Sequence, residues 1–359
     1  MATIRKNSPK YKRWIKRRNA KNLRKRTKRK KKAPSYFFGS AGKSIKRVSK
    51  PSRKNDWEKV IVKAPKNFSL INNPDEVSGF FDEVKSYIVS RKNKKVSVYF
   101  NLFEVEEVTI DAIIYLLALI KNLQSYGLTR RHFQGNLPQN EKASEMFKES
   151  GFLSFVSSNL SSINTNADKI TIKTGRSNDS NVLKEICEFI INKSGCTRKD
   201  TKFLYVLMAE MMYNTYEHAY EDKTTAPKNW YIFVECDDKV AKITFVDTGL
   251  GIPRTMRKNF GEKLFAVSPD KLVLSALNGE FRSQTKLPYR NNGLPTIKSY
   301  VDKKMITKLY LITNKAYCFG TYKNGQVDID ANVLQNAIMG TMFYWEVPFS
   351  KLRGDVNGL

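Results

Sequence analysis

The sequence lacks the features that mark disulfide-rich, zinc-binding or membrane-spanning proteins. Its 359 residues include four cysteines and two histidines, and no C-x-x-C pair is present. We therefore expect neither a disulfide framework nor a zinc site, and a reducing cytoplasm suits such a chain. The longest apolar run, residues 112–120, ends at Lys121 and is too short to cross a bilayer. No apolar signal segment opens the sequence, so we expect neither secretion nor a membrane partner.

Acidic residues are absent from residues 1–54, which hold 23 of the 64 Lys and Arg residues. The remainder carries 41 basic against 34 acidic residues, so most of the net charge of +30 belongs to this segment. Repulsion between like charges opposes folding, and we expect residues 1–54 to form a disordered basic arm. The densest part of the arm includes Arg24, Lys25, Arg26, Arg29 and Lys30.

This basic arm is typical of segments that bind phosphate backbones, because each neutralised phosphate releases counterions. Aromatic residues such as Tyr11 and Trp14 are interleaved with the charges and are available to stack on bases. We predict that the arm binds nucleic acid. Another acidic partner or a membrane surface is one alternative, and a solubilising tail without a dedicated role is the other.

Apolar residues are plentiful, at 41% of the chain with 17 Tyr and 21 Phe, which is ample for a sizeable core. The length favours two domains behind the arm. Between residues 55 and 160, short apolar strands alternate with segments of helical spacing. The expected strands are 60–62, 95–102 and 132–136, and the expected helices are 74–89, 112–125 and 140–150. This order predicts an α/β domain.

Two short features of this segment indicate a family. Asp111 stands at the start of the apolar helix 112–125, and Gly151-Phe152-Leu153 follows the last helix. In these features residues 55–160 resemble STAS domains, the family of anti-sigma-factor antagonists and transporter tails, which implies a domain that binds a protein partner. STAS switch proteins carry a phosphorylatable serine directly after the aspartate, where this chain has Ala112. The alternative is a plain α/β interaction domain in which Asp111 is a helix N-cap.

Residues 161–359 are expected to form a second domain, in which a short strand at 169–173 precedes helices at 182–192 and 198–220. On the second helix, Glu210 and Asn214 lie one turn apart and share a face. A carboxylate and an amide on a mostly apolar helix are costly to bury without partners. Mg²⁺ with a water molecule would supply such partners, because a hard cation prefers oxygen ligands. The alternative is that both side chains face solvent.

A second motif follows strands 230–235 and 240–246, which predict a hairpin. The second strand ends in Asp247, and Gly249 and Gly251 come next. A carboxylate at this place can accept a hydrogen bond from an exocyclic amine, and glycines let the backbone approach a flat ring closely. A plain turn is the alternative.

Two more motifs complete the pattern. Gly293 and Leu294 open a predicted helix that continues to residue 301, and the free N–H groups of a helix start suit an anion. Gly340 and Thr341 precede a predicted strand at 342–348.

In order and spacing, the four motifs resemble the ATP-binding boxes of the GHKL superfamily, which includes gyrase, heat-shock chaperones, histidine kinases and mismatch-repair proteins. The resemblance implies an α/β sandwich of a mixed sheet with helices on one face, and it implies ATP and Mg²⁺ as ligands. It further implies that Asn214 binds Mg²⁺, that Glu210 positions or deprotonates the attacking water or hydroxyl, and that Asp247 accepts the adenine amine.

The resemblance assigns the other candidates as well. Gly249 and Gly251 would shape the base pocket, Gly293 and Leu294 would contact phosphates through their backbone, and Thr341 would lie near the adenine. His218 would lie near the phosphates or pack within its helix. Residues 253–290 would form a basic lid, for which an ordinary basic surface is the alternative. Asn291 replaces a glycine that is frequent in the third box, so a looser closure over the phosphates is expected.

These features predict an ATP-dependent switch, with Mg²⁺-dependent ATPase activity, that regulates a partner through the STAS-like domain and the arm. One alternative is a serine/threonine kinase of the anti-sigma-factor type, and another is a nucleotide-binding module without turnover. A sensor histidine kinase is rejected, because His132, the histidine upstream of the ATP boxes, lies in a predicted strand region rather than on a dimerisation helix. A homodimer is compatible with each hypothesis.

Deleting residues 1–54 tests the role of the arm. We expect the full chain to bind nucleic acid with an affinity that falls steeply as salt rises, because the contacts are made to phosphates. The truncated chain should lose this binding, which fluorescence anisotropy with a labelled oligonucleotide would measure. Equal affinity of both proteins would show that the arm does not bind nucleic acid.

Overall fold

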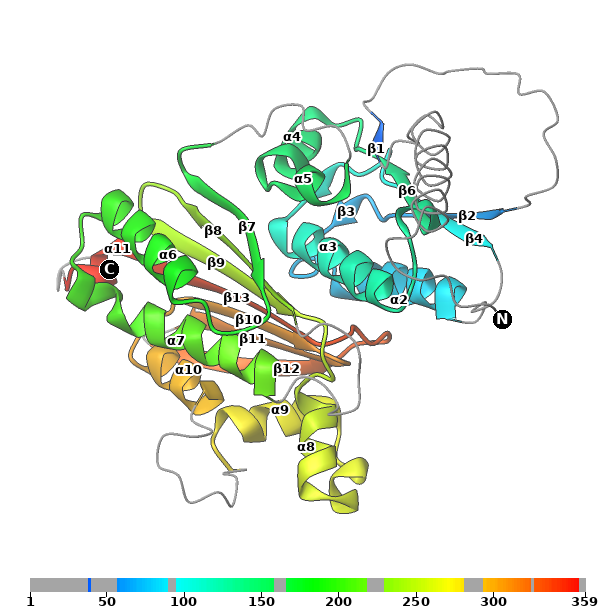
Figure 1. The fold of residues 1–359 in the computed structure, drawn as a ribbon. Coiled ribbons are helices and arrows are strands. Elements are labelled where there is room, and N and C mark those ends of the chain that lie inside the picture. The colour runs from blue at the N-terminus through cyan, green and yellow to red at the C-terminus, as the bar shows by residue number, and fades with distance from the viewer. Residues whose placement is uncertain are drawn as a thin grey trace, which may run out of the picture. The chain divides into compact units, whose positions relative to one another are not determined.

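The computed structural model describes residues 38–39, 57–89, 95–157, 166–217, 229–280, 293–323 and 326–354. These residues form sheets of four, two and seven strands with helices packed against them (Figure 1). We call residues 38–39 and 57–157 the N-terminal part and residues 166–354 the C-terminal part. The basic residues predicted to bind nucleic acid, from Arg24 to Lys30, lie outside the described residues.

The N-terminal part is built on parallel strands, which require crossover helices to join them. The four-stranded sheet has the order β1 (Phe38–Gly39), β6 (Phe133–Asn136), β4 (Val96–Asn101) and β2 (Glu58–Lys63), and every pairing is parallel. Two short strands, β3 (Asn67–Phe68) and β5 (Glu107–Val108), form a second parallel pair. The helical elements are α2 (Pro74–Val89), α3 (Ile110–Ser125), η1 (Arg130–His132), α4 (Glu141–Glu149) and α5 (Phe152–Val156).

The C-terminal part is built on an antiparallel sheet of seven strands in the order β12-β11-β10-β13-β9-β8-β7. The bounds of these strands are β7 (Lys169–Gly175), β8 (Trp230–Cys236), β9 (Val240–Asp247), β10 (Lys308–Thr313), β11 (Ala316–Lys323), β12 (Gln326–Val333) and β13 (Thr341–Pro348). Every pairing in the sheet is antiparallel. Strand β13 comes last in sequence and inserts between β9 and β10, so it completes the sheet in its centre.

Helices of the C-terminal part cover one face of this sheet. They are α6 (Ser180–Ser194), α7 (Arg198–Glu217), α9 (Pro269–Leu277), α10 (Gly293–Asp302) and α11 (Phe349–Leu352). Two further helical elements, α8 (Ile252–Phe260) and η2 (Glu262–Ala266), precede α9 in the sequence. Side chains that alternate along the strands, such as Ile232, Val234 and Ile243, share a core with these helices. Alternation is what a strand buried on this face requires.

The other face of the seven-stranded sheet packs against helix α3 of the N-terminal part (Figure 1). The opposite strand residues, among them Tyr231, Phe233 and Val246, share a core with α3. Of the 16 residues of α3, 13 are buried. An α-helix that is apolar all round is stable only when it is enclosed on every side, and here the strands of both parts enclose it.

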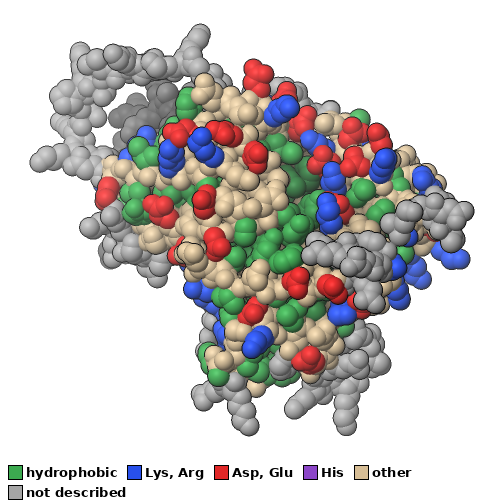
Figure 2. Space-filling model, turned by 180° about the vertical axis from the view of Figure 1, so that it is seen from behind, with side chains coloured by type: hydrophobic (Ala, Val, Ile, Leu, Met, Phe, Trp, Pro, Cys, Tyr) green, Lys and Arg blue, Asp and Glu red, His purple; other side chains and the backbone are tan. Residues whose placement is uncertain are grey.

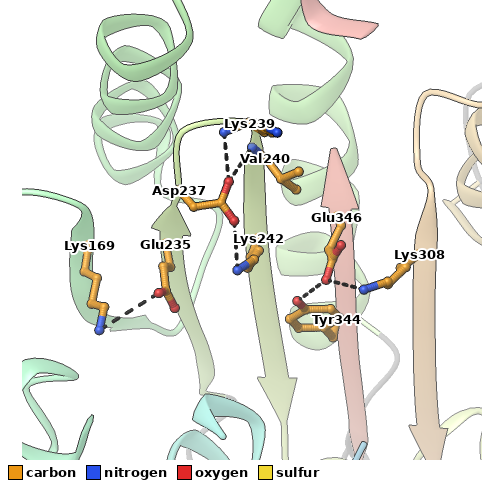
Figure 3. A network of polar contacts seen from close by, with 9 residues as sticks. All are labelled: Lys169, Glu235, Asp237, Lys239, Val240, Lys242, Lys308, Tyr344 and Glu346. Atoms are coloured by element: carbon orange, nitrogen blue, oxygen red, sulfur yellow. Dashed lines mark hydrogen bonds and ion pairs between the residues drawn. The ribbon is translucent and has the colours of Figure 1, made fainter. Parts of the chain in front are cut away.

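Charged side chains follow a different pattern from the core. On the face shown in Figure 2, acidic and basic side chains are interspersed rather than separated by sign. At one end of the seven-stranded sheet, opposite charges alternate across five neighbouring strands (Figure 3), in the order Lys169, Glu235, Lys242, Glu346 and Lys308. Opposite-charge pairs favour this register, because a slip of one residue would move every side chain to the other face.

Several sequence predictions are confirmed. Helix α2 has the predicted bounds, and α3, α4 and α10 agree with the predicted helices to within two residues. The hairpin of β8 and β9 forms as expected. Helix α4 begins as its sequence indicates, because the side chain of Asn140 accepts a hydrogen bond from the Ala143 amide.

Other predictions are wrong. The seven-stranded sheet is antiparallel rather than mixed, and helix α3 covers the face opposite the predicted helices. Asp111 is not the N-cap of α3, which is Thr109; it lies within the first turn. Strands β10 to β12 and helix α8 were not predicted, and neither was the two-residue strand β1 inside the segment expected to be a disordered arm.

Two further findings concern the environment of the chain. Within the described residues, no helix is long and apolar enough to span a membrane. All four cysteines, Cys187, Cys196, Cys236 and Cys318, are free and buried.

Asp111 offers a test of how α3 is attached to the N-terminal part. Its buried carboxylate accepts hydrogen bonds from the Leu70 amide at 2.6 Å and the Ile71 amide at 3.2 Å. Burial raises the pKa of this carboxyl group. We expect Asp111→Ala to lower the free energy of unfolding by about 2 kcal/mol, because two buried N–H groups lose their acceptor.

The matched control is Asp111→Asn, which keeps an acceptor oxygen and removes the buried charge. It should unfold at nearly the wild-type urea concentration at pH 7. If both variants lose the same stability, the hydrogen bonds to Leu70 and Ile71 are not the cause.

Candidate functional site

The structure brings the first and third sequence motifs together. Glu210 and Asn214 lie on helix α7, both partly buried, and helix α10 packs against α7. Gly293 begins α10, and a Cβ atom placed on it would lie 2.9 Å from Asn214 Nδ2 and 3.3 Å from Glu210 Oε2. The two polar side chains therefore point at the start of α10, where backbone N–H groups lack helical partners. Leu294, the next residue, is partly buried against the core that α7 and α10 share.

The environment of Glu210 suits a proton acceptor. Partial burial raises the pKa of its carboxyl group, because the charged form loses solvation. A general base works best when its pKa lies nearer to the working pH than that of an exposed carboxylate. Asn214 lies one helical turn away, so its side-chain amide and the Glu210 carboxylate both lie beside Gly293.

The second and fourth motifs form another cluster. Asp247 ends strand β9, and Thr341 begins the neighbouring strand β13 directly opposite it. The Asp247 carboxylate is buried and accepts a hydrogen bond from the Gly249 amide at 2.7 Å. Burial raises the pKa of Asp247 to about 7, although the backbone amides of Gly249 and Thr341 lower it in part. A buried carboxylate with free acceptor capacity is a strong partner for an N–H donor.

Two glycines make this cluster sterically possible. A Cβ atom on Gly340 would lie 2.1 Å from the Asp247 carbonyl oxygen and 2.7 Å from the Gly249 nitrogen. A Cβ atom on Gly251 would lie 2.6 Å from Asn314 Nδ2, and the φ angle of Gly251 is +81°. No other residue type fits at either place without moving the backbone. The turn after Asp247 therefore packs closely against Gly340, which precedes β13, and against Asn314, which follows β10.

Thr313 and Asn314 are the residues that sequence reasoning missed. The Thr313 hydroxyl accepts from the Ile252 amide at 2.9 Å, donates to the Gly340 carbonyl at 3.0 Å and contacts the Thr341 hydroxyl at 3.2 Å. Asn314 donates to the Leu250 carbonyl at 2.9 Å.

A signal for these two residues was present in the sequence. Asn314 and Lys315 separate strands β10 and β11, and asparagine is favoured in tight hairpins because it tolerates a positive φ angle, here 54°. The sequence pattern did not predict the two strands, so it did not indicate the turn between them.

The two clusters are connected through helices. Helix α8 begins directly after Gly251 and packs against α9, which in turn packs against α10. In the predicted lid, Arg257 is partly buried and donates hydrogen bonds to the Leu264 and Val267 carbonyl oxygens. Arg257 thus supports the lid from inside, while Arg254 and Lys258 are exposed.

Some predicted site residues cannot be placed. His218, Asn291 and residues 281–290 of the predicted lid lie outside the described residues. Among the residues that are described, no group of three or more His, Cys, Asp or Glu side chains could hold a metal ion by itself. A surface groove of about 590 Å³ lies elsewhere, along α2, and its lining includes Lys63, Lys66 and Phe80 but none of the candidate site residues.

Comparison with protein-family models and with curated proteins finds no match for this chain.

The buried carboxyl group of Asp247 should make the stability of the protein depend on pH. Its raised pKa means that the folded state keeps the proton that the unfolded state releases above about pH 4. Stability therefore falls as pH rises from about 4 to about 7, by about 1.4 kcal/mol for each pH unit in that window. We expect Asp247→Asn to remove this loss and to raise the melting temperature at pH 8 by roughly 5 °C or more.

The contrast with low pH is the control. At pH 4 the wild-type carboxyl group is protonated in the folded state, so Asp247→Asn should change the melting temperature little. Scanning calorimetry at both values would measure this, and an equal shift at pH 4 and pH 8 would contradict the buried-charge explanation.

Proposed function

We propose that the C-terminal part binds ATP with Mg²⁺ and that the chain acts as an ATP-dependent switch. The observation that carries the proposal is the pair of close approaches around the motif glycines. Gly293 lies against Asn214 and Glu210, and Gly340 lies against Asp247. Residues from four separate sequence motifs thus meet in two clusters, as a base-binding and a phosphate-binding region would require.

In the proposed complex, the charged carboxylate of Asp247 accepts a hydrogen bond from the adenine amine. Thr341 of β13 lies opposite Asp247, and its hydroxyl contacts the Thr313 hydroxyl of β10 at 3.2 Å. Gly249 and Gly251 leave room for the flat ring beside the backbone. The buried position of Asp247 favours this role, because a hydrogen bond in a dry environment discriminates strongly against a base without the donor.

The phosphates would lie at the start of α10, over Gly293 and Leu294. Asn214 and Glu210 are the residues that would hold Mg²⁺ and a water molecule. Few protein ligands suffice for this ion, which keeps several waters and takes phosphate oxygens. Bound Mg²⁺ would neutralise charge on the phosphates, while the Glu210 carboxylate orients and deprotonates the attacking water.

The remaining assignments depend on the partners of the chain. We propose that the N-terminal part binds a protein partner, that the arm binds nucleic acid or another acidic partner, and that the switch works in the cytoplasm. The four free, buried cysteines support a reducing compartment. Homodimerisation remains a prediction.

A serine/threonine kinase of the anti-sigma-factor type is the second candidate. The acceptor would have to come from another protein, because Ala112 occupies the expected serine position and is fully buried. The nearby Thr109 hydroxyl is buried as well. A nucleotide-binding module without turnover is the third candidate, and the raised pKa of the partly buried Glu210 carboxyl group beside Gly293 favours turnover over it.

Incubating the full chain with γ-labelled ATP and Mg²⁺ distinguishes the three candidates. Release of free phosphate supports the ATPase, label on an added partner supports the kinase, and retention of intact ATP supports the binding module. We expect Glu210→Gln to bind ATP with wild-type affinity and to lose at least about a hundredfold in turnover, the scale of a general base.

Asp247→Asn should show the reverse of Glu210→Gln. Its ATP affinity should fall by about tenfold or more, because one charge-assisted hydrogen bond to the base is lost. Calorimetric titration would measure both variants. A wild-type affinity of Asp247→Asn for ATP would contradict the assignment of Asp247 as the residue that binds the adenine amine.

A further inference from the structure

Helix α3 of the N-terminal part contacts both backbone segments that surround Asp247. One segment is the turn that begins at Thr248, directly after Asp247. The other is the loop 334–340 between β12 and β13, which ends at Gly340 and leads into Thr341. Neither contact was expected from the sequence, because α3 belongs to a different predicted domain.

The first contact is made by Asn122. Its side-chain amide donates a hydrogen bond to the Thr248 hydroxyl at 3.1 Å, and both residues are buried. The other amide atom, Asn122 Oδ1, has no hydrogen-bond partner among the described residues. A half-satisfied buried amide costs free energy that a leucine would not, so its presence in an apolar helix indicates a role beyond packing.

The second contact is made by Tyr115. Its hydroxyl accepts a hydrogen bond from the Met339 amide at 2.6 Å and donates one to the Met339 carbonyl at 3.1 Å. One side chain therefore satisfies both main-chain polar groups of the residue before Gly340. Burial raises the pKa of the Tyr115 hydroxyl, and the Asp247 carboxylate lies close enough to raise it further.

Close packing connects these contacts to Asp247. Gly340 packs so closely on the Asp247 carbonyl that a single Cβ atom would overlap it. Thr341, the next residue, is paired with Asp247 across the strands. A shift of Met339 or Thr248 by a few tenths of an ångström would therefore move the carboxylate, since close-packed interiors transmit displacements.

We propose that Tyr115 and Asn122 are positioning residues for base recognition, and that α3 holds the Asp247 carboxylate in its binding orientation from behind the sheet. This inference deepens the proposed function and rests on it.

The same arrangement couples the N-terminal part to the nucleotide. Loop 334–340 also contacts α2, because Asp75 accepts a hydrogen bond from the Gln335 amide at 2.9 Å and Gly79 lies against the Asn336 side chain. A partner that displaces α2 or α3 would change ATP affinity. By thermodynamic reciprocity, ATP would then change the affinity for that partner by the same factor.

The test uses the full chain with Tyr115→Phe and Asn122→Leu. We expect each to weaken ATP binding by about fivefold to tenfold and to reduce the ATP-to-GTP affinity ratio by a similar factor. A purely structural role would lower the melting temperature without changing this ratio.

The matched control is Tyr317→Phe. The Tyr317 hydroxyl also joins the two parts, but its hydrogen bond goes to the Ile71 carbonyl at 2.8 Å and not to Thr248 or Met339. It should lower the melting temperature and leave ATP affinity and the ATP-to-GTP ratio at wild-type values. Equal losses in all three variants would mean that general loosening, not positioning, causes the effect, and would overturn the proposal.

The outcomes separate this inference from the proposed function. If wild-type protein binds ATP, Asp247→Asn weakens it, and both Tyr115→Phe and Asn122→Leu bind as wild type, then the positioning role is wrong and the function stands. If wild-type protein binds no ATP, the function itself is wrong. Should Asn122→Leu fail to fold, Thr248→Val removes the same hydrogen bond from the other side and gives the same reading.

Discussion

The enclosure of helix α3 between strands of both parts is the constraint on which the rest of the structure depends. Thirteen of its 16 residues are buried, so it is stable only while the N-terminal and C-terminal parts stay packed on it. Its apolar side chains join a core that includes Tyr231, Phe233 and Val246 of the seven-stranded sheet. The back of the proposed ATP site is thus a helix from another part of the chain, and the site cannot move independently of it.

Polar groups buried in this enclosure explain how a hydrophobic interface acquires specificity. Asp111 attaches α3 to the loop at Leu70, whereas Tyr115 and Asn122 attach it to Met339 and Thr248. Each group costs free energy to bury and regains it only in one relative position of helix and sheet. Asp247 carries a similar cost, visible in its raised pKa, which ligand binding would offset. Buried polar groups therefore gather where the proposed switch must sense a ligand.

The sequence was informative wherever a local rule decides the outcome. Helical spacing predicted α2, and two apolar strands joined by a short loop predicted the hairpin of β8 and β9. Local rules failed for β10 to β12, because strands in a meander depend on neighbours that are distant in sequence. They failed again at Asp111, where the structure shows hydrogen bonds from residues 41 and 40 positions earlier in place of the capping role suggested by its position.

The sequence by itself determined the α/β class, the separation of the basic arm from the acid-containing remainder, and the residues of the candidate site other than Thr313 and Asn314. It could do so because periodicity, charge and motif spacing act over short stretches of chain. Only the tertiary structure decided that the seven-stranded sheet is antiparallel and that α3 lies behind Asp247. Both follow from which surfaces find complementary partners when the chain packs, and no short stretch of sequence contains that information.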